Sequence, residues 1–313
     1  MRPHLLLAAA LLAASACGGT SGNPTVGGNT NVQVLLTDSP FPFDKVARAD
    51  LFIVSVSAGS DSGSGGSDCT GATLIAKPNK RFNLLALQRG ATALIGEGNL
   101  SAGSYGAVCV VINTDSSSLT LKNGTVLNSR TNPGINWSAT GERIIKTNIW
   151  KAIAVSDTGG TFVIHFDVGN SFIPAADVTP PGPAGWYYYV PSIEVVDPAS
   201  VGAISGTVVD GSSTRIVNAS IRAMVGFPST PANTEFVAAT GTTDSAGVFK
   251  LAFLIPSSFW ATRGWIYFVE INPPSASSLV LTRIPGVTVN AGTETALGTI
   301  TLNSPAVTAS RSR

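Results

Sequence analysis

The chain has 313 residues, of which 33 are glycine and 19 are proline, and 12% are charged, with a formal net charge of +1. A near-neutral chain without a basic patch is not typical of a nucleic-acid-binding protein, so we expect no nucleic-acid partner. The length fits two domains of ordinary size, and abundant Thr, Ser, Val and Gly favour an exported β protein over an acidic disordered chain.

Residues 1–16 have the pattern of an export signal. Arg2 precedes an apolar run from Leu5 to Ala16. This run is too short to cross a bilayer, because a spanning helix needs about 20 residues. The run ends in the sequence ASAC, which resembles the lipobox of bacterial lipoproteins, where the cysteine receives a diacylglyceryl group. The sequence therefore predicts lipid attachment at Cys17, although Ala14 stands where that motif most often has leucine.

Two outcomes of signal cleavage remain open. The sequence ASA is also an ordinary A-x-A cleavage site, and both signal peptidases would cut before Cys17. They differ in whether Cys17 carries lipid. Residues 17–30 form the lipidated cysteine and a flexible linker with an r.m.s. span of roughly 20 Å, which favours a tether. Gly18 after the cysteine favours sorting to the outer membrane.

Short apolar runs rich in β-branched residues predict the strands of a first domain over residues 31–198. No helical periodicity is sustained, which favours an antiparallel β-sandwich or barrel. Residues 82–87 fit either a helical turn or a strand. The expected strands, including a hairpin with an Asn-Gly turn, are 31–37, 50–57, 73–76, 106–113, 119–127, 143–149, 161–168 and 186–196.

Four ordered segments of this domain resemble the DUF4382 family of bacterial lipoprotein domains. They contain the sequences VLLTDSPFPFD, FNLLALQRG, LSAGSY and FVIHFDVGNS. The resemblance covers about residues 31–198 and implies a fold and an envelope location but no enzyme. One departure is His165, which stands where the family usually has the first Asp of a D-F-D sequence.

Residues 202–303 contain a second set of predicted strands. The sequences GAISGTVVD and TTDSAGVF make this part similar to carboxypeptidase-regulatory-like (prealbumin-like) domains, which implies a seven-stranded β-sandwich that serves as a non-catalytic spacer or adhesion module. Residues 304–313 are predicted to be a disordered tail. The seven expected strands are 203–209, 219–225, 235–240, 248–254, 265–271, 279–284 and 296–302.

The chain has three cysteines. If Cys17 carries lipid, Cys69 and Cys109 remain as an even pair in an oxidising compartment, and we predict a disulfide that holds the preceding Gly/Ser loop to the sheet. The alternative is two free thiols, with Cys109 buried in its apolar strand. The cysteines lack metal-ligand spacing, so we expect no zinc site.

Aromatic residues offer one candidate ligand-binding surface. Trp137, Trp150 and the run Trp186, Tyr187, Tyr188 and Tyr189 can stack on sugar rings if they are exposed. Strand alternation sends Trp186 and Tyr188 to one face and Tyr187 and Tyr189 to the other, so at least one of these faces is expected to be core.

Ionisable residues give weaker functional hypotheses. His165 is predicted to point outward from a half-exposed strand, because its neighbours Ile164 and Phe166 take the core face. Asp38, Asp44 and Asp167 are a candidate calcium cluster, but Asp38 is explained as well by the turn that follows it. A hydrolase built from scattered carboxylates is the least favoured hypothesis, because no paired spacing is present.

We therefore predict an all-β protein with two β-sandwich domains in tandem behind a lipoprotein signal peptide and tether. The expected function is that of a non-enzymatic bacterial cell-envelope lipoprotein with a structural, adhesion or binding role, without metal or cofactor. The alternative is a carbohydrate-binding accessory protein. The expected partners are a membrane, reached through the N-terminal lipid, and a polysaccharide or another envelope protein.

Overall fold

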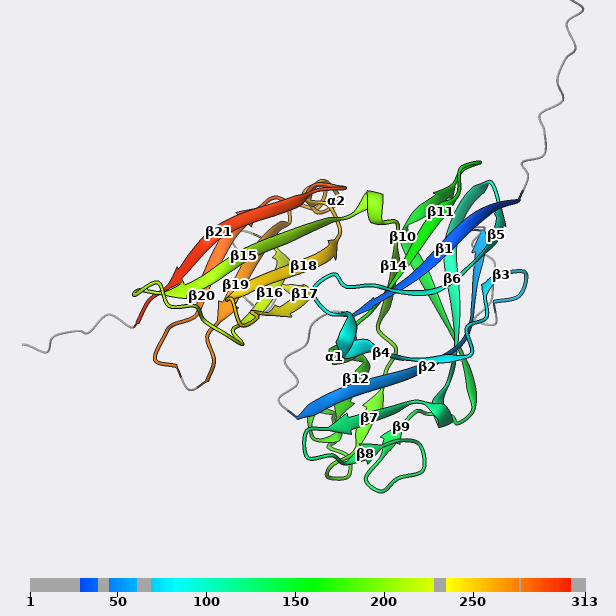
Figure 1. Ribbon diagram of the computed structural model, residues 1–313, viewed down its shortest axis with the longest axis horizontal. Coiled ribbons are helices and arrows are strands. Elements are labelled where there is room, and N and C mark those ends of the chain that lie inside the picture. Colours follow the sequence, from blue (N-terminus) through cyan, green and yellow to red (C-terminus); the bar gives the residue numbers. More distant parts are fainter. Residues whose placement is uncertain (1–28, 39–44, 61–68, 228–234, 276, 305–313) are drawn as a thin grey trace, which may run out of the picture.

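Two hydrophobic cores organise the chain in the computed structural model (Figure 1). One core belongs to residues 29–196, called the first domain here, and the other to residues 202–302, called the second domain. The structure describes residues 29–38, 45–60, 69–227, 235–275 and 277–304.

Several predicted features lie outside the described residues. These are the signal segment 1–16, Cys17 with most of its linker, Asp44, and residues 305–313 of the tail. Within the described ranges, no helix combines the length and apolar character that a membrane span needs.

The first domain is built from three sheets. A four-stranded sheet has the order β14-β11-β1-β5, and a larger sheet has the order β10-β6-β2-β7-β8, with β3 and β4 paired to β2. A small sheet has the order β12-β13-β9. The strands are β1 Asn29–Asp38, β2 Val46–Ser60, β3 Thr73–Ala76, β4 Lys80–Asn83, β5 Ala93–Ser101, β6 Gly103–Asn113, β7 Ser118–Leu121, β8 Val126–Leu127, β9 Ile135–Asn136, β10 Glu142–Val155, β11 Gly160–Phe166, β12 Phe172–Pro174, β13 Tyr187–Tyr189 and β14 Ile193–Val196.

Short helical turns connect these strands. Four of them are 3₁₀ turns, and α1 is a single α-helical turn that follows β11. They are η1 Leu84–Leu87, η2 Thr114–Ser116, α1 Val168–Ser171, η3 Ala175–Asp177 and η4 Pro198–Ser200.

Alternation along β1 and β11 creates one wall of the first core. Val32, Val34 and Leu36 of β1 are buried, and Phe162 and Ile164 of β11 lie on the same side of the sheet. The two strands run parallel, with Val34 opposite Phe162. The expectation of a purely antiparallel sandwich is therefore wrong at this pair, because β11 returns beside β1 only after the chain has built the larger sheet.

The second domain is a sandwich of a three-stranded sheet, β18-β15-β21, and a four-stranded sheet, β17-β16-β19-β20. All seven strands expected from the sequence form, although β20 begins three residues later than predicted. The elements are β15 Gly202–Asp210, β16 Ser220–Gly226, β17 Phe236–Thr242, β18 Val248–Leu254, α2 Ser257–Ala261, β19 Ile266–Asn272, β20 Thr282–Val287 and β21 Glu294–Leu302.

Several elements of the first domain differ from the prediction, among them the short β9, β12 and α1. The expected single strand over 186–196 is divided into β13 and β14, because Pro191 lies between them and has no backbone N–H for a ladder. Strand β5 was not predicted, since its glycines weaken the strand pattern. Gly98 of β5 is required there, because a Cβ at this position would overlap the backbone oxygen of Ile75 in β3.

The predicted disulfide between Cys69 and Cys109 is confirmed, with the two Cα atoms 6.2 Å apart. Cys109 is buried in β6, between β2 and β10. The bond therefore fixes the chain after residues 61–68, which lie outside the described part, to the larger sheet.

Candidate functional site at the domain junction

The two domains meet through a small apolar cluster. Val163 of β11, Val196 of β14 and Val201 of the connection are buried in it, and Phe253 of the second domain packs against them. Trp150 of β10 packs there too and meets the ring of Phe259 edge-on at 5.2 Å. The outer face of the β11–β14 sheet is therefore covered by the second domain (Figure 1).

Phe253 reaches this junction because β18 contains a β-bulge. Gly202 pairs with Leu254 and Ile204 with Leu251, so Ala252 and Phe253 together lie opposite one residue of β15. The bulge keeps Leu254 in the second core and leaves Phe253 outside it.

The backbone of Phe253 has φ 60°, in the left-handed region. A bulky residue in this conformation costs about 1–2 kcal/mol. The packing that surrounds its ring must offset this cost. The junction therefore holds a strained backbone whose side chain points away from its own domain.

His165 lies at the junction rather than on an open surface. Its ring centroid is 6.1 Å from that of Phe253, and the residue is only 8% exposed. The prediction of a half-exposed histidine is wrong, because the second domain covers this face of β11. Burial lowers the pKa of His165, and the charge of Asp167 opposes this shift only in part. The imidazole is therefore neutral at neutral pH.

A cavity of about 320 Å³ opens beside this cluster, between the domains. All its lining residues lie in the described ranges, and no lysine or arginine is among them. Four aromatic residues and two carboxyl groups contribute to its walls. Its lining residues are His165, Asp167, Asn170, Ser192, Ile193, Glu194, Phe236, Val237, Ala238, Phe253, Leu254, Ile255, Trp260 and Tyr267.

Glu194 is the carboxyl group that stands out in this lining. It pairs with His165 across the β11–β14 ladder, so both side chains project to the same face. Burial raises the pKa of Glu194 to about 7. Sequence pattern alone does not predict a role for Glu194, because its pairing with His165 depends on the strand register.

The titration of Glu194 predicts a pH-dependent stability. Because the pKa is raised from its usual 4.5 to about 7, the folded state holds the proton more tightly than the unfolded state. The free energy of unfolding should therefore fall as the pH rises through this window. We expect Glu194→Gln to flatten that fall, measured by urea unfolding at about pH 5 and about pH 8.

The stability also depends on the other titratable groups that face the cavity. His165, whose pKa is lowered, removes stability as the pH falls through its usual range near 6.5. Asp167 and the hydroxyl of Tyr267 also face the cavity. The comparison of wild type with Glu194→Gln isolates the glutamate, and identical pH profiles for the two proteins would refute the assignment.

The aromatic residues proposed as a sugar platform lie mainly in the first core. Trp137, Tyr187 and Tyr189 are buried there and do not form an open aromatic platform, although Trp137 and Trp186 both border a pocket of about 370 Å³. The rings of Trp137 and Tyr189 are 4.6 Å apart. Tyr188 of β13 and Trp186, which directly precedes that strand, are half-buried, which agrees with the predicted alternation.

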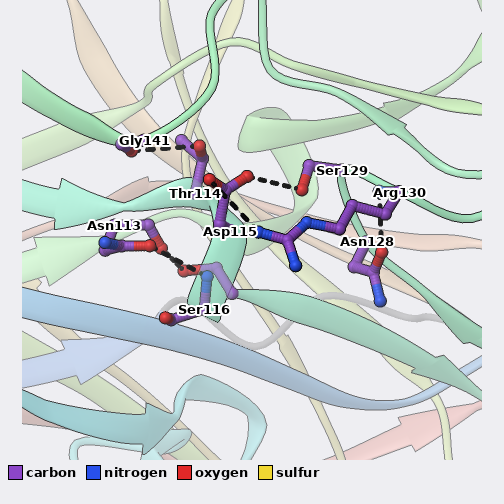
Figure 2. A network of polar contacts seen from close by, with 9 residues as sticks. Asn113, Thr114, Asp115, Ser116, Asn128, Ser129, Arg130 and Gly141 are labelled. Carbon is purple, nitrogen blue, oxygen red and sulfur yellow. Dashed lines mark hydrogen bonds and ion pairs between the residues drawn. The ribbon is translucent and has the colours of Figure 1, made fainter.

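A polar network holds the loop between β8 and β9 (Figure 2). Asn113 caps η2 by accepting from the backbone N–H of Ser116 at 3.0 Å. Asp115 accepts from the Ser129 hydroxyl at 2.8 Å and lies 3.7 Å from the Arg130 guanidinium. These contacts fix the loop before β9, so they have a structural role.

The candidate calcium residues form the turn at α1. Asp38 accepts a hydrogen bond from the backbone N–H of Val168 at 3.1 Å. Asp167 accepts from the backbone N–H and from the side-chain amide of Asn170, at 3.0 and 2.7 Å. Asp44 lies outside the described residues, and within the described ranges no group of three or more His, Cys, Asp or Glu side chains is placed to hold a metal ion.

The comparison with protein families agrees with the resemblance seen in the sequence. The DUF4382 family model, a domain of unknown function, matches residues 29–179. The match ends before β14, whereas the structure shows β14 paired to β11 in the same sheet. No curated protein sequence matches the chain.

Three solved structures illustrate the similarity at the level of structure. A 9R-lipoxygenase from Cyanothece PCC8801 is 15% identical, with 33% of this chain and 16% of that chain covered and a TM-score of 0.22. The Bacillus anthracis TIE protein is 10% identical (91% and 42% covered, TM-score 0.23), and the shaft pilin SpaA from Lactobacillus rhamnosus GG is also 10% identical (90% and 99%, TM-score 0.23). At these scores the likeness supports no functional statement about this chain.

Proposed function

We propose that the chain is a non-enzymatic, lipid-anchored protein of the bacterial cell envelope, in which two packed β-sandwich domains have a structural, adhesion or binding role. The signal segment that ends at Cys17 carries this proposal. The disulfide between Cys69 and Cys109 agrees with it, because such bonds persist in oxidising compartments outside the cytoplasm.

The junction supports the structural part of the proposal. An apolar cluster and two aromatic contacts join the domains, so relative domain motion is more restricted than a bare linker would allow. The connection itself is short and ordered, since Asp197 caps η4 by accepting from the backbone N–H of Ala199 at 2.9 Å. Such a pair of domains holds a constant length, as a spacer on a membrane anchor must.

The anchor is tested by Cys17→Ser. We expect wild-type protein in the membrane fraction, with a mature N-terminal peptide whose mass includes a diacylglyceryl group on Cys17. The variant should lose this mass and leave the membrane fraction, because a single removed thiol takes away every acyl chain. The measurement is cell fractionation combined with mass spectrometry of the N-terminal peptide.

Ser21→Ala is the matched control, because Ser21 lies in the same linker and carries no expected modification. It should behave as wild type. An unlipidated Cys17 in the mature wild-type chain would show that the ordinary cleavage occurs and would refute the anchor.

A further inference from the structure

We propose that the cavity at the domain junction binds a small organic cation, that is, an amine with an apolar body. The proposal goes beyond the structural role and does not depend on the lipid anchor. Its basis is the combination of a partly open cavity, aromatic side chains in its lining, and a carboxyl group, that of Glu194, for which no cation among the described residues is a partner.

The size and the walls of the cavity fit a small ligand. Its volume of about 320 Å³ lies at the lower end of the range of ligand sites, roughly 300–1,000 Å³. Phe236, Phe253 and Trp260 contribute aromatic rings to the lining. Phe236 stays 37% exposed although it is large and apolar, so a ligand can still cover it.

The charge of the lining selects a cation. Asp167 and Glu194 are its acidic groups, His165 is neutral, and the lining contains no lysine or arginine among the described residues. An anion would meet like charge there, whereas a cation gains both Coulomb attraction and contact with aromatic faces. A purely apolar ligand would leave the carboxyl group of Glu194 without a polar partner.

Glu194 differs from the other partly buried glutamates. Its pKa is shifted by burial alone, with no hydrogen bond or charge partner among the causes. In the second domain, by contrast, the partly buried Glu235 and Glu270 each have a cationic partner, in the pairs Glu235–Arg283 and Glu270–Arg222. A bound ammonium group would give Glu194 the cationic partner that the other glutamates find in arginine side chains of the protein.

The polar groups of Trp260 and Tyr267 in the cavity wall already have hydrogen-bond partners within the protein. The Trp260 indole donates to the Tyr267 hydroxyl at 3.0 Å, and that hydroxyl donates to the carbonyl oxygen of Ile255 at 2.8 Å. These side chains are thus held in place before a ligand arrives. A rigid aromatic wall needs little ordering on binding, which favours affinity.

The test is isothermal titration of the mature full-length protein with choline and with n-butylamine, each beside a neutral isostere, 3,3-dimethylbutan-1-ol for choline and 1-butanol for n-butylamine. We expect at least one cation to bind and its isostere to bind about tenfold more weakly or not at all. Both cations keep their charge between about pH 6 and about pH 8. Their affinity should rise several-fold over that interval as Glu194 ionises.

Glu194→Gln should weaken cation binding about tenfold and remove its pH dependence. Glu97→Gln is the matched control, because Glu97 lies in β5, away from the cavity, where it accepts from Gln33. Circular dichroism and the melting midpoint establish that both variants fold.

Three outcomes would overturn the proposal. They are equal affinity for a cation and its isostere, unchanged binding by folded Glu194→Gln, and no binding of either cation at millimolar concentration near pH 8. A lipidated protein that shows any of them would keep its envelope role and lose only this site.

Discussion

Trp137→Ala is expected to lower the free energy of unfolding by about 3–5 kcal/mol. The indole is only 2% exposed and packs edge-on against Phe172, with ring centroids 5.6 Å apart, and against Tyr189 at 4.6 Å. Truncation leaves a cavity among these rings and removes the aromatic contacts, each worth about 0.5–1.5 kcal/mol beyond its buried area. Urea unfolding followed by tryptophan fluorescence and circular dichroism measures the loss.

Two comparisons separate packing from ligand binding. The indole N–H of Trp137 has no hydrogen-bond partner among the described residues, so Trp137→Phe should retain most of the stability that alanine loses. Trp186→Ala, on the half-buried side of the same small sheet, should cost clearly less. If Trp137→Ala kept wild-type stability, the ring would not be a core residue and the sugar-platform hypothesis would return.

Sequence pattern predicted which strand faces are buried and where most strands of the second domain lie, because both depend on neighbouring residues in the chain. Alternation placed Phe162 and Ile164 on the core face of β11, and it separated Tyr187 and Tyr189 from Trp186 and Tyr188. Both results need only the two-residue period of a strand and one buried face. The seven strands of the second domain were equally visible, because turn residues separate them.

The candidate site could not be predicted in the same way, because it depends on contact between domains. His165 and Glu194 lie on the outer face of their sheet, and only the presence of the second domain makes this face an interior. The role of Phe253 requires a β-bulge and a positive φ, which a phenylalanine between two apolar residues does not signal. Sequence pattern reveals what one strand buries, but not what a neighbouring domain will cover.

The family match covers only part of the cavity at the domain junction. The family match reaches residue 179 and therefore contains His165 and Asp167, whereas Glu194 follows it. The cavity is completed by residues of the second domain. Its chemistry thus belongs to the pair of domains, and the first domain expressed alone would expose these ionisable groups to water.

Replacing both Cys69 and Cys109 with alanine is expected to lower the free energy of unfolding by about 4 kcal/mol. The two residues are 40 positions apart, so the bond restricts a long segment of the unfolded chain that contains β3, β4 and β5. Its removal should also raise the urea m-value, because the unfolded chain then exposes more surface. Alanine suits the buried position of Cys109, where a serine hydroxyl would need a partner.

Reductant distinguishes the loss of the bond from the loss of side-chain packing. In the presence of dithiothreitol, the free energy of unfolding of the wild type should fall close to that of the double variant. The free energy of unfolding of the variant should not change when dithiothreitol is added. Thiol labelling under denaturing conditions without reductant gives the independent reading. If Cys69 and Cys109 both reacted there, or if reductant left the wild type unchanged, the disulfide would make no contribution, and the larger sheet would hold the chain after residue 69 by packing and hydrogen bonds alone.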